Sequence, residues 1–362
     1  MNTNSQETNL NKFHIPSLDG LRAVAICIVF LSHVGLGKVI PGGLGVTIFF
    51  FLSGYLITTL LRIEQMKTGE INLKKFYIRR MLRIWPNFYL VLFLGALLTI
   101  LTVLPGKVNA EGLLAQSLHF ANYYGIFWGG VGTTIGTSVF WSLAVEEHFY
   151  LAFPFIYILL LKCKPELTQN QLLSIIIGLC FVALFWRIYL VWLDHAPQYR
   201  TYYASDTRFD SLLFGCGLAL FKNPAIDTNH QMSEKSLKYI WLPLGIGLLL
   251  LSLVYRSDLF RETIRYSIQG IALIPIFIAA IRFPNWGLFK VLNLKLVRYI
   301  GVLSYSFYLV HHTIIESLNS YFPEASLLLL GTSAAALSLL IAHIIHKLVE
   351  VRLIELRKKY SR

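Results

Sequence analysis

The sequence predicts an all-α fold, a polytopic transmembrane helical bundle of about ten spans with both termini in the cytoplasm. Of the 362 residues, 56% are hydrophobic and only 14% are charged. A soluble protein of this size would have about a quarter of its residues charged. Long apolar stretches recur from Leu21 to the C-terminal region. Every second connection between these stretches is rich in basic residues.

Ten apolar stretches are interpreted as spans. The first lacks the short apolar region and small-residue cleavage site of a signal peptide, so we expect it to be retained. A polar segment over 1–16 precedes one membrane domain over 17–350, and a basic tail covers 351–362. The predicted spans are 18–36, 43–62, 84–105, 136–161, 171–193, 208–222, 239–255, 266–282, 299–321 and 326–348.

The charge pattern tests this count independently. With the N-terminus inside, the even-numbered connections are rich in Lys and Arg, as between Lys74 and Arg83. The odd-numbered connections contain few basic residues, such as Lys38 and Lys107. The positive-inside rule therefore supports ten spans, because a miscounted span would scramble the alternation. The net charge of the chain is +13, and its basic residues cluster in connections on one side, which favours the lipid bilayer over nucleic acid as partner.

Two stretches are ambiguous. The segment 113–128 is about sixteen residues long and contains Gln116, His119 and Asn122. We interpret it as interfacial or re-entrant on the outer side, because it is too short and too polar to span a bilayer. The predicted span over 208–222 is also short and could be tilted or broken.

Arg22 and His33 are the polar pair of the first span. Eleven helical residues turn through about 1100°, so the two side chains lie within roughly 20° of one face. They are separated by about 16 Å along the axis, roughly half a bilayer. Such groups are costly inside a membrane, which favours a functional role.

Glu146 and Glu147 lie about midway along the fourth span, where Glu146 shares a face with Ser142 and Tyr150. Adjacent intramembrane carboxyl groups must bind cations or be partly protonated, because desolvation and mutual repulsion disfavour their charged forms. The alternative is that one of them pairs with an arginine to fix helix packing.

Arg79 and Arg83 have i,i+4 spacing where the third span begins. Both guanidinium groups point the same way and could clamp phosphates. Alone, they would be an ordinary positive-inside cluster. Together with Arg22 on the cytoplasmic side, they suit a long donor with a phosphate-rich head and an arm that extends toward His33.

Other polar residues leave alternatives open. Residues from Asp206 to Asp210, including Arg208, could start a helix, form a salt bridge or line an outer cavity. For His311 and His312, packing and a site role are equally favoured. The sequence contains no zinc signature, so no metal is expected, and the four cysteines are interpreted as packing residues.

These residues resemble, in order and over nearly the whole chain, the motifs of the bacterial acyltransferase-3 family of membrane acyltransferases. Two positions depart from the family pattern. Thr47 stands where an acidic residue is usual, and His148 stands where Gln is usual. The matching stretches are Leu18–Arg22 with His33, Phe50–Ile57, Phe76–Pro86, Trp141–Leu151, Thr207–Asp210 and Ser304–His311.

The resemblance implies transfer of an acyl group, most often acetyl from cytoplasmic acetyl-CoA, to a hydroxyl of a cell-surface or lipid-linked carbohydrate. A bacterial inner (plasma) membrane protein is expected. Many relatives carry an extracytoplasmic hydrolase-like domain, so we expect any second catalytic partner to be another protein. The predicted roles are catalysis by His33, Glu146 and Glu147, donor binding by Arg22, Arg79 and Arg83, and substrate binding by Tyr150, Arg208, Asp210 and His311.

Two other functions remain possible from the residues. A proton-coupled transporter could use His33, Glu146 and Glu147 as a relay. A structural membrane subunit would need none of them. The acceptor, the acyl chain length, an acyl-enzyme intermediate and the oligomeric state are left open by the sequence.

Overall fold

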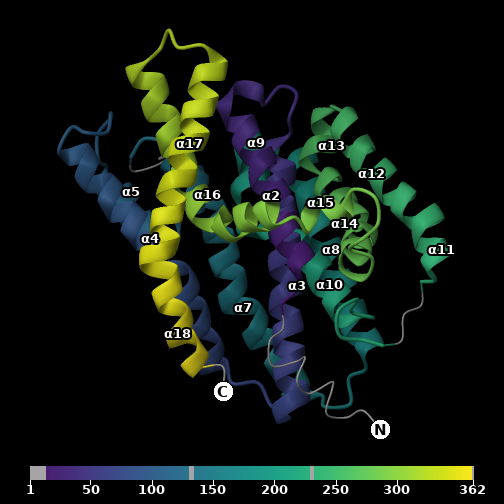
Figure 1. The fold of residues 1–362 in the computed structure, drawn as a ribbon. Helices are drawn as coiled ribbons and strands as arrows, with labels where there is room; N and C mark the ends of the chain where they lie inside the picture. Colours follow the sequence, from purple (N-terminus) through teal and green to yellow (C-terminus); the bar gives the residue numbers. More distant parts are fainter. Residues whose placement is uncertain (1–13, 130–133, 229–231, 361–362) are drawn as a thin grey trace.

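The computed structural model describes residues 14–129, 134–228 and 232–360. Every regular element within these ranges is a helix, which confirms the predicted all-α class. Residues 1–13 of the predicted N-terminal segment and the last two residues of the predicted tail lie outside the described residues. Eight helical segments are long and apolar enough to cross a membrane (Figure 1): Pro16–Leu36, Gly42–Thr68, Leu73–Ile100, Thr137–Cys163, Gln169–Trp192, Glu234–Val254, Arg265–Arg282 and Leu327–Leu356.

The two other predicted spans form helices that do not meet these criteria. Helix α10 (Ser205–Leu220) is too short, and α16 (Lys295–Tyr321) is long enough but too polar. His311 and His312 lie within α16 and lower its hydropathy. Length and composition therefore support eight spans, and the count of ten remains a prediction.

Helix boundaries differ from the prediction in three places. The third helix begins at Leu73, where the Asn72 side chain caps it, and not at residue 84. The ambiguous segment 113–128 forms two helices of eight residues each, too short to span a bilayer. The first residues of the predicted tail are helical. The elements concerned are α4 (Leu73–Ile100), α5 (Ala110–Ser117), α6 (Ala121–Trp128), α17 (Leu327–Ile345), η4 (His346–Glu350) and α18 (Val351–Lys359).

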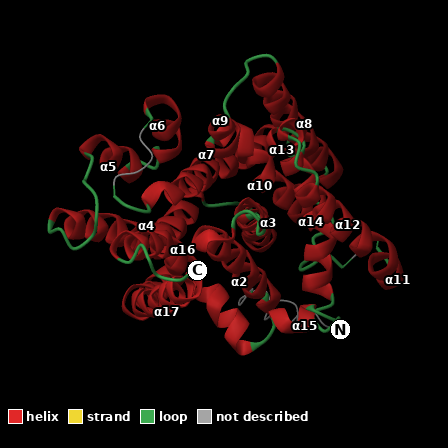
Figure 2. Ribbon diagram, turned by 90° about the horizontal axis from the view of Figure 1, so that it is seen from above, coloured by secondary structure: helices red, strands yellow, loops and turns green. Residues whose placement is uncertain are grey.

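Helix α3 (Gly42–Thr68) lies at the centre of the bundle. Figure 2 shows it surrounded by α2, α7, α10 and α16. Of an apolar stretch of 18 residues in this helix, 78% is buried. Only 17% of the corresponding 18-residue stretch within Glu234–Val254 is buried, and α12 lies at the edge. The remaining bounds are α2 (Pro16–Leu31), η1 (Ser32–Leu36), η2 (Thr137–Phe140), α7 (Trp141–Cys163), α8 (Gln169–Trp192), α9 (Gln198–Tyr203), α11 (Glu234–Ser236), η3 (Leu237–Trp241), α12 (Leu242–Val254), α13 (Asp258–Glu262), α14 (Arg265–Arg282) and α15 (Phe289–Leu292).

Glycines allow the central helices to approach closely. A Cβ atom added to Gly54 of α3 would lie 1.9 Å from the carbonyl oxygen of Leu212, and one added to Gly215 of α10 would lie 2.0 Å from that of Phe51. The backbones of α3 and α10 are therefore in direct contact, as is common where membrane helices pack through small residues.

A third glycine joins α2 to α16. A Cβ at Gly301 would lie 1.8 Å from the carbonyl oxygen of Asp19. This contact holds the N-terminal half of α16 against the beginning of α2, beside Arg22.

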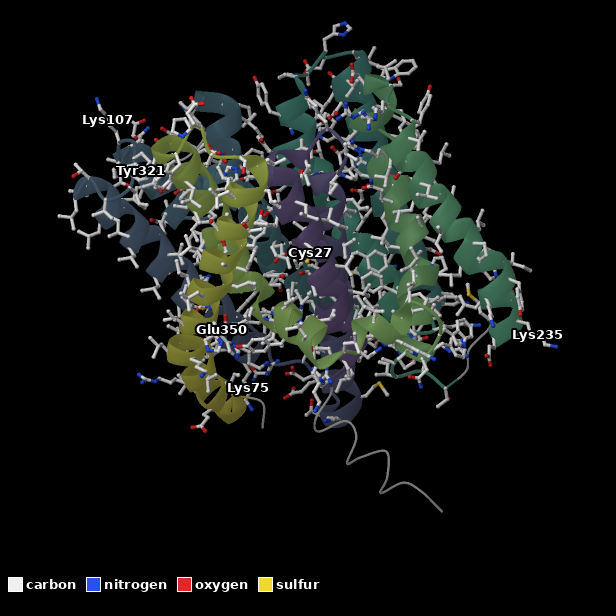
Figure 3. All side chains as sticks on the ribbon, turned by 45° about the horizontal axis from the view of Figure 1, so that its top comes forward. Cys27, Lys75, Lys107, Lys235, Tyr321 and Glu350 are labelled. Atoms are coloured by element: carbon white, nitrogen blue, oxygen red, sulfur yellow. The ribbon has the colours of Figure 1, made fainter. Side chains whose placement is uncertain are left out.

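The lysines that Figure 3 labels agree with the predicted orientation. Lys75 and Lys235, both in connections predicted to be cytoplasmic, lie toward the lower end of the molecule, and Lys107 lies toward the upper end. Glu350 lies on the lower side, and Cys27 of α2 lies near the middle.

We expect Gly215→Leu to destabilise the protein by about 3 kcal/mol or more, because overpacking here must separate two backbones. Thermal melting in detergent, with size-exclusion chromatography, measures the effect. Gly178→Leu is the matched control, since nothing lies within 4 Å of a Cβ added at Gly178 in α8. Equal melting temperatures for the two variants would contradict the close contact of α3 with α10.

Candidate functional site

A cavity of about 270 Å³ lies between α2, α3, α4, α7, α16 and the helix that contains η4 and α18. Of the predicted site residues, Arg22, Arg83, Glu146 and Tyr150 line it. The cavity therefore brings together side chains that are up to 128 positions apart in the chain, from Arg22 to Tyr150.

Three arginines line the cavity: Arg22, Arg80 and Arg83. Arg22 is paired with Asp19, at 3.2 Å from Nη1 to Oδ1. The Arg80 guanidinium lies 5.3 Å from the centre of the Tyr150 ring, and its Nη2 is buried without a hydrogen-bond partner. Within the described part of the chain, no carboxylate lies within 4.0 Å of the charged groups of Arg80 and Arg83. A buried donor of this kind is suited to an anionic ligand.

Arg79, which i,i+4 spacing places beside Arg83, has other partners. Its Nη2 lies 2.6 Å from Oε2 of Glu64 at the end of α3, and its Nη1 donates to the carbonyl oxygen of Tyr360. Arg79 is not among the described residues that line the cavity. Arg80 is three residues before Arg83 and also shares its side of the helix, but the sequence did not distinguish these two faces.

The two adjacent glutamates have different surroundings. Glu146 accepts hydrogen bonds from Ser53 (2.9 Å) and from the hydroxyl of Tyr150 (2.8 Å) inside the cavity. Glu147 points elsewhere: its Oε2 lies 3.5 Å from the indole nitrogen of Trp85, and its Oε1 is buried without a partner. The two carboxyl groups therefore do not act on one ligand in this arrangement.

A cluster of polar groups lines another part of the cavity and was not predicted. Glu350 accepts hydrogen bonds from Asn87 and Ser306, both at 2.6 Å, and lies 2.7 Å from Nδ1 of His346. Its members come from α4, α16 and η4. The i,i+4 spacing of His346 and Glu350 is visible in the sequence, but no spacing or periodicity connects them with Asn87 and Ser306.

His33 and His311 are in contact. His33 lies in the π-helical turn η1, and its Nδ1 is 2.9 Å from Nε2 of His311 on α16. The ring planes differ by 16°, and the ring centroids are 5.1 Å apart. Such π-helical turns are frequent at functional sites. The sequence indicated each histidine separately and gave no sign that they meet.

The partners of His311 fix the protons of this pair. Nδ1 of His311 lies 2.8 Å from the carbonyl oxygen of Tyr308. A carbonyl can only accept, so Nδ1 of His311 must hold the proton, and Nε2 of the neutral ring must accept from Nδ1 of His33. The lone pair of His33 is therefore left on Nε2, where it can act as a base or a nucleophile.

Tyr308 connects the histidine pair with the cavity. It lines the cavity, and its ring centroid lies 5.4 Å from that of His311. Its hydroxyl donates to the carbonyl oxygen of Val139 and lies 2.7 Å from Oγ of Ser142. These contacts hold the Tyr308 ring between the cavity and His311.

Arg208 and Asp210 are completely buried in separate contacts. Asp210 pairs with Arg187 at 2.7 Å. Arg208 donates to the hydroxyl of Thr47, the residue that replaces the usual acid, and to the carbonyl of Tyr202. Its guanidinium also lies near four aromatic rings: Phe50, Trp141, Tyr202 and Tyr266.

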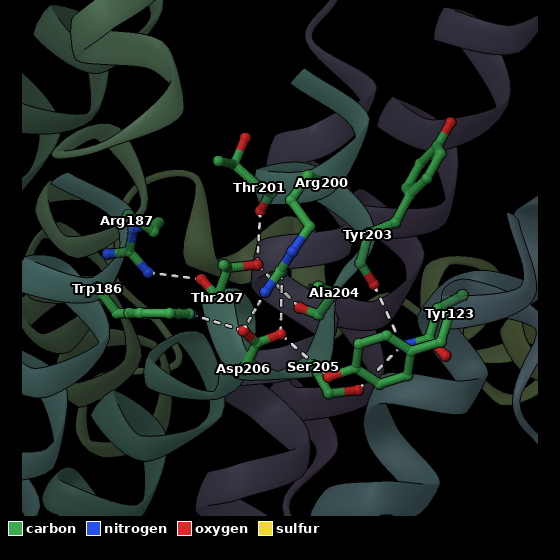
Figure 4. Close-up of polar contacts among 11 residues, drawn as sticks. Tyr123, Trp186, Arg187, Arg200, Thr201, Tyr203, Ala204, Ser205, Asp206 and Thr207 are labelled. Atoms are coloured by element: carbon green, nitrogen blue, oxygen red, sulfur yellow. Dashed lines mark hydrogen bonds and ion pairs between the residues drawn. The ribbon is translucent and has the colours of Figure 1, made fainter. Parts of the chain in front are cut away.

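Asp206 connects four helices at the start of α10 (Figure 4). Arg200 and Trp186 donate to its Oδ2 at 2.5 and 2.6 Å, and Tyr123 donates to Oδ1 at 3.0 Å. Burial disfavours the charged carboxylate, but the hydrogen bonds and charge of Arg200, with the other donors, hold the pKa of Asp206 below its ordinary value. Asp206 is therefore a salt-bridge partner that joins α6, α8, α9 and α10.

In the described ranges, no group of three or more His, Cys, Asp or Glu side chains is arranged to hold a metal ion.

Two further histidines have partners of their own. His148, the second position that departs from the family pattern, contacts Oγ of Ser205 through Nδ1 at 2.7 Å. His312 lies beside the histidine pair, with its Nδ1 3.0 Å from the carbonyl of Gly136 and its ring 4.6 Å from that of His33.

Known proteins match this chain over most of its length. A family model described as an acyltransferase domain matches residues 15–347. Peptidoglycan O-acetyltransferase OatA of Listeria monocytogenes serovar 1/2a is 32% identical over 321 residues, which are 85% of this chain and 50% of that protein. O-acetyltransferase OatA of Staphylococcus aureus strain NCTC 8325 is 32% identical over 328 residues, 87% of this chain and 53% of that protein.

A putative O-acetyltransferase of Staphylococcus aureus strain COL is 30% identical over 324 residues, again 87% of this chain and 53% of that protein. The chain thus spans about half the length of the curated relatives it matches. No solved structure matches it.

Proposed function

We propose a function from the premise that this chain belongs to the acyltransferase-3 family: it transfers an acetyl group from cytoplasmic acetyl-CoA to a hydroxyl of a cell-surface carbohydrate. The observation that supports this most directly is the cavity with three arginines on one side and the His33–His311 pair beyond Tyr308. The names of the relatives support acetyl as the group and peptidoglycan as one class of acceptor.

The arginines suit the donor's phosphates. Arg22, Arg80 and Arg83 offer forked guanidinium donors, which match phosphate oxygens in two-point contacts. The i,i+4 spacing predicted Arg79 as the partner of Arg83 in donor binding, and we propose Arg80 for this role instead. With the phosphates held there, the arm of the donor would extend past Glu146 and Tyr150 toward Tyr308. The three phosphate-binding arginines lie on the basic side, which is predicted to face the cytoplasm.

His33 would then act at the reacting bond through Nε2. As a general base, it takes the proton from the acceptor hydroxyl while the hydroxyl oxygen bonds to the thioester carbon. The carbon–sulfur bond breaks, and the proton passes to the departing thiolate, so atoms and charge balance. In the other route, Nε2 itself bonds to the thioester carbon while the carbon–sulfur bond breaks and the thiolate leaves. The acceptor oxygen then takes the acyl group from Nε2, and the acceptor's proton passes to the thiolate. Both routes need the free lone pair on Nε2.

We assign His311 as a positioning residue. Nε2 of His311 accepts a hydrogen bond from the N–H group at Nδ1 of His33. The free lone pair of His33 is thereby kept on its own Nε2. The same logic applies to catalytic histidines that are oriented by a hydrogen bond to their other nitrogen. Glu146, bound by Ser53 and Tyr150, would balance the charge of the arginines when no donor is bound.

The remaining predicted roles stay proposals. Substrate contact by Tyr150 is compatible with its place in the cavity. Contact by Arg208 or Asp210 would require these buried residues to lose existing partners, so we favour a packing role for both. A bacterial inner membrane location is also proposed, from the apolar helices and the names of the relatives.

We expect His33→Ala to lower acetyl transfer at least 100-fold, since loss of a general base costs roughly that much. Mass spectrometry of surface glycans from cells that make wild-type or variant protein measures transfer. His343→Ala, on α17 and outside the cavity lining, is the control for insertion and expression. Full transfer by His33→Ala would remove His33 from the mechanism. Substrate flux across sealed vesicles without acyl-CoA would favour the transporter alternative.

Arg80→Gln and Arg83→Gln should each raise the KM for acetyl-CoA roughly tenfold, because each removes a charged hydrogen bond of about 1.5–3 kcal/mol. Arg79→Gln should change KM little and instead weaken the contact with Glu64. Radiolabelled acetyl transfer by purified protein gives the constants. A KM for Arg79→Gln as high as that for Arg80→Gln would restore Arg79 to the donor site.

His311→Leu should reduce kcat by about 10–100-fold, the range typical for loss of an orienting partner. The KM for acetyl-CoA should stay unchanged, because His311 does not line the cavity in the described part of the chain. His311→Gln keeps a hydrogen-bond acceptor and should recover much of kcat. A purely structural role would instead lower melting temperature in both variants without this split between kcat and KM.

A further inference from the structure

A second cavity lies away from the candidate active site, between α8, α10 and α14. Its volume is about 470 Å³, and its lining is almost entirely apolar. Along α14, residues at three- and four-residue spacing from Ser267 to Arg282 line it, so the groove is about 22 Å long. None of the residues that we place in acetyl transfer belongs to this lining.

The groove opens sideways to the surroundings of the bundle. Ile271, Ile177 and Phe181 line it and are still about half exposed, at 50%, 47% and 53%. For a helix bundle in a bilayer, this exposed surface faces hydrocarbon. The occupant should therefore enter from the lipid phase and be apolar over most of its length.

Two cations lie at one end of this apolar groove. Lys222 follows the end of α10, and Arg282 is the last residue of α14. Among the described residues, no carboxylate lies within 4.0 Å of either charged group. The Nη1 atom of Arg282 donates to the carbonyl of Met232, which leaves its other donors for a ligand. Charge on an otherwise apolar groove points to an anion at this end.

We propose that this groove binds an anionic phospholipid, with an acyl chain along α14 and the phosphate at Lys222 and Arg282. Both cations lie at the ends of predicted spans that the charge pattern places on the cytoplasmic side, and the cytoplasmic leaflet is rich in anionic lipid. A zwitterionic lipid would bring its own cationic group near Lys222 and Arg282, which weakens its binding there. The site is separate from acetyl transfer, so it can be tested by binding alone.

Native mass spectrometry of the purified full chain, titrated with phosphatidylglycerol or phosphatidylcholine of the same acyl chains, tests the proposal. Wild-type protein should bind phosphatidylglycerol more tightly. The double variant Lys222→Gln/Arg282→Gln should bind it roughly tenfold more weakly or worse, since each basic residue near an anionic surface contributes about 1 kcal/mol. Lys235→Gln/Lys238→Gln removes two exposed charges outside the groove lining and should bind like wild type.

A second variant tests the apolar part. Ile271→Trp would fill the groove and should reduce phosphatidylglycerol binding, whereas Leu250→Trp, at an exposed position of α12 outside the lining, should not. Three results would overturn the proposal: equal binding of both lipids by wild type, equal losses in the two charge variants, or unchanged binding by Ile271→Trp. The last remains decisive if Lys222→Gln/Arg282→Gln fails to fold.

Discussion

The contact between α2 and α16 is the constraint on which the rest of the site depends. Gly301 lets the beginning of α2 contact α16 beside Arg22. Eleven residues after Arg22, His33 contacts His311 of the same α16. Because both helices are long and rigid, these two contacts fix the distance from the arginine side of the cavity to the histidines. A donor bound at one end is thereby aligned with a base at the other, which lowers the entropic cost of bringing the reacting groups together.

The buried charged side chains of the bundle are stabilised by different kinds of partner. Buried charge in an apolar medium is costly unless it is paired and hydrogen-bonded. Arg187 and Asp210 form a buried ion pair, and Arg208 is surrounded by aromatic rings and the Thr47 hydroxyl in place of a carboxylate. Rings can stabilise a cation without a negative charge. Each of Arg80 and Arg208 has one buried nitrogen atom without a partner, but only Arg80 lines the cavity. That difference separates a binding residue from a structural one.

The sequence was a good guide to the fold and a partial guide to the site. Hydropathy and charge alternation indicated the helices, because both are local properties of the chain, and α10 and α16 form although they fail span criteria. The i,i+4 relation of Glu146 and Tyr150 is present as a hydrogen bond. Spacing failed where two faces of one helix were equally plausible, as for Arg79 and Arg80. The cluster around Glu350 joins three distant segments, and only the i,i+4 spacing of His346 and Glu350 was visible in the sequence.

The sequence by itself determined that this is a helical membrane protein with the ordered motifs of one acyltransferase family. Composition, periodicity and motif order belong to the chain and need no knowledge of packing. Only the tertiary structure decided which neighbour faces the cavity, Arg80 or Arg79 and Glu146 or Glu147, and that His311 is the partner of His33. Adjacent residues on a helix point about 100° apart, and which of them faces inward is set by the helices that pack against it.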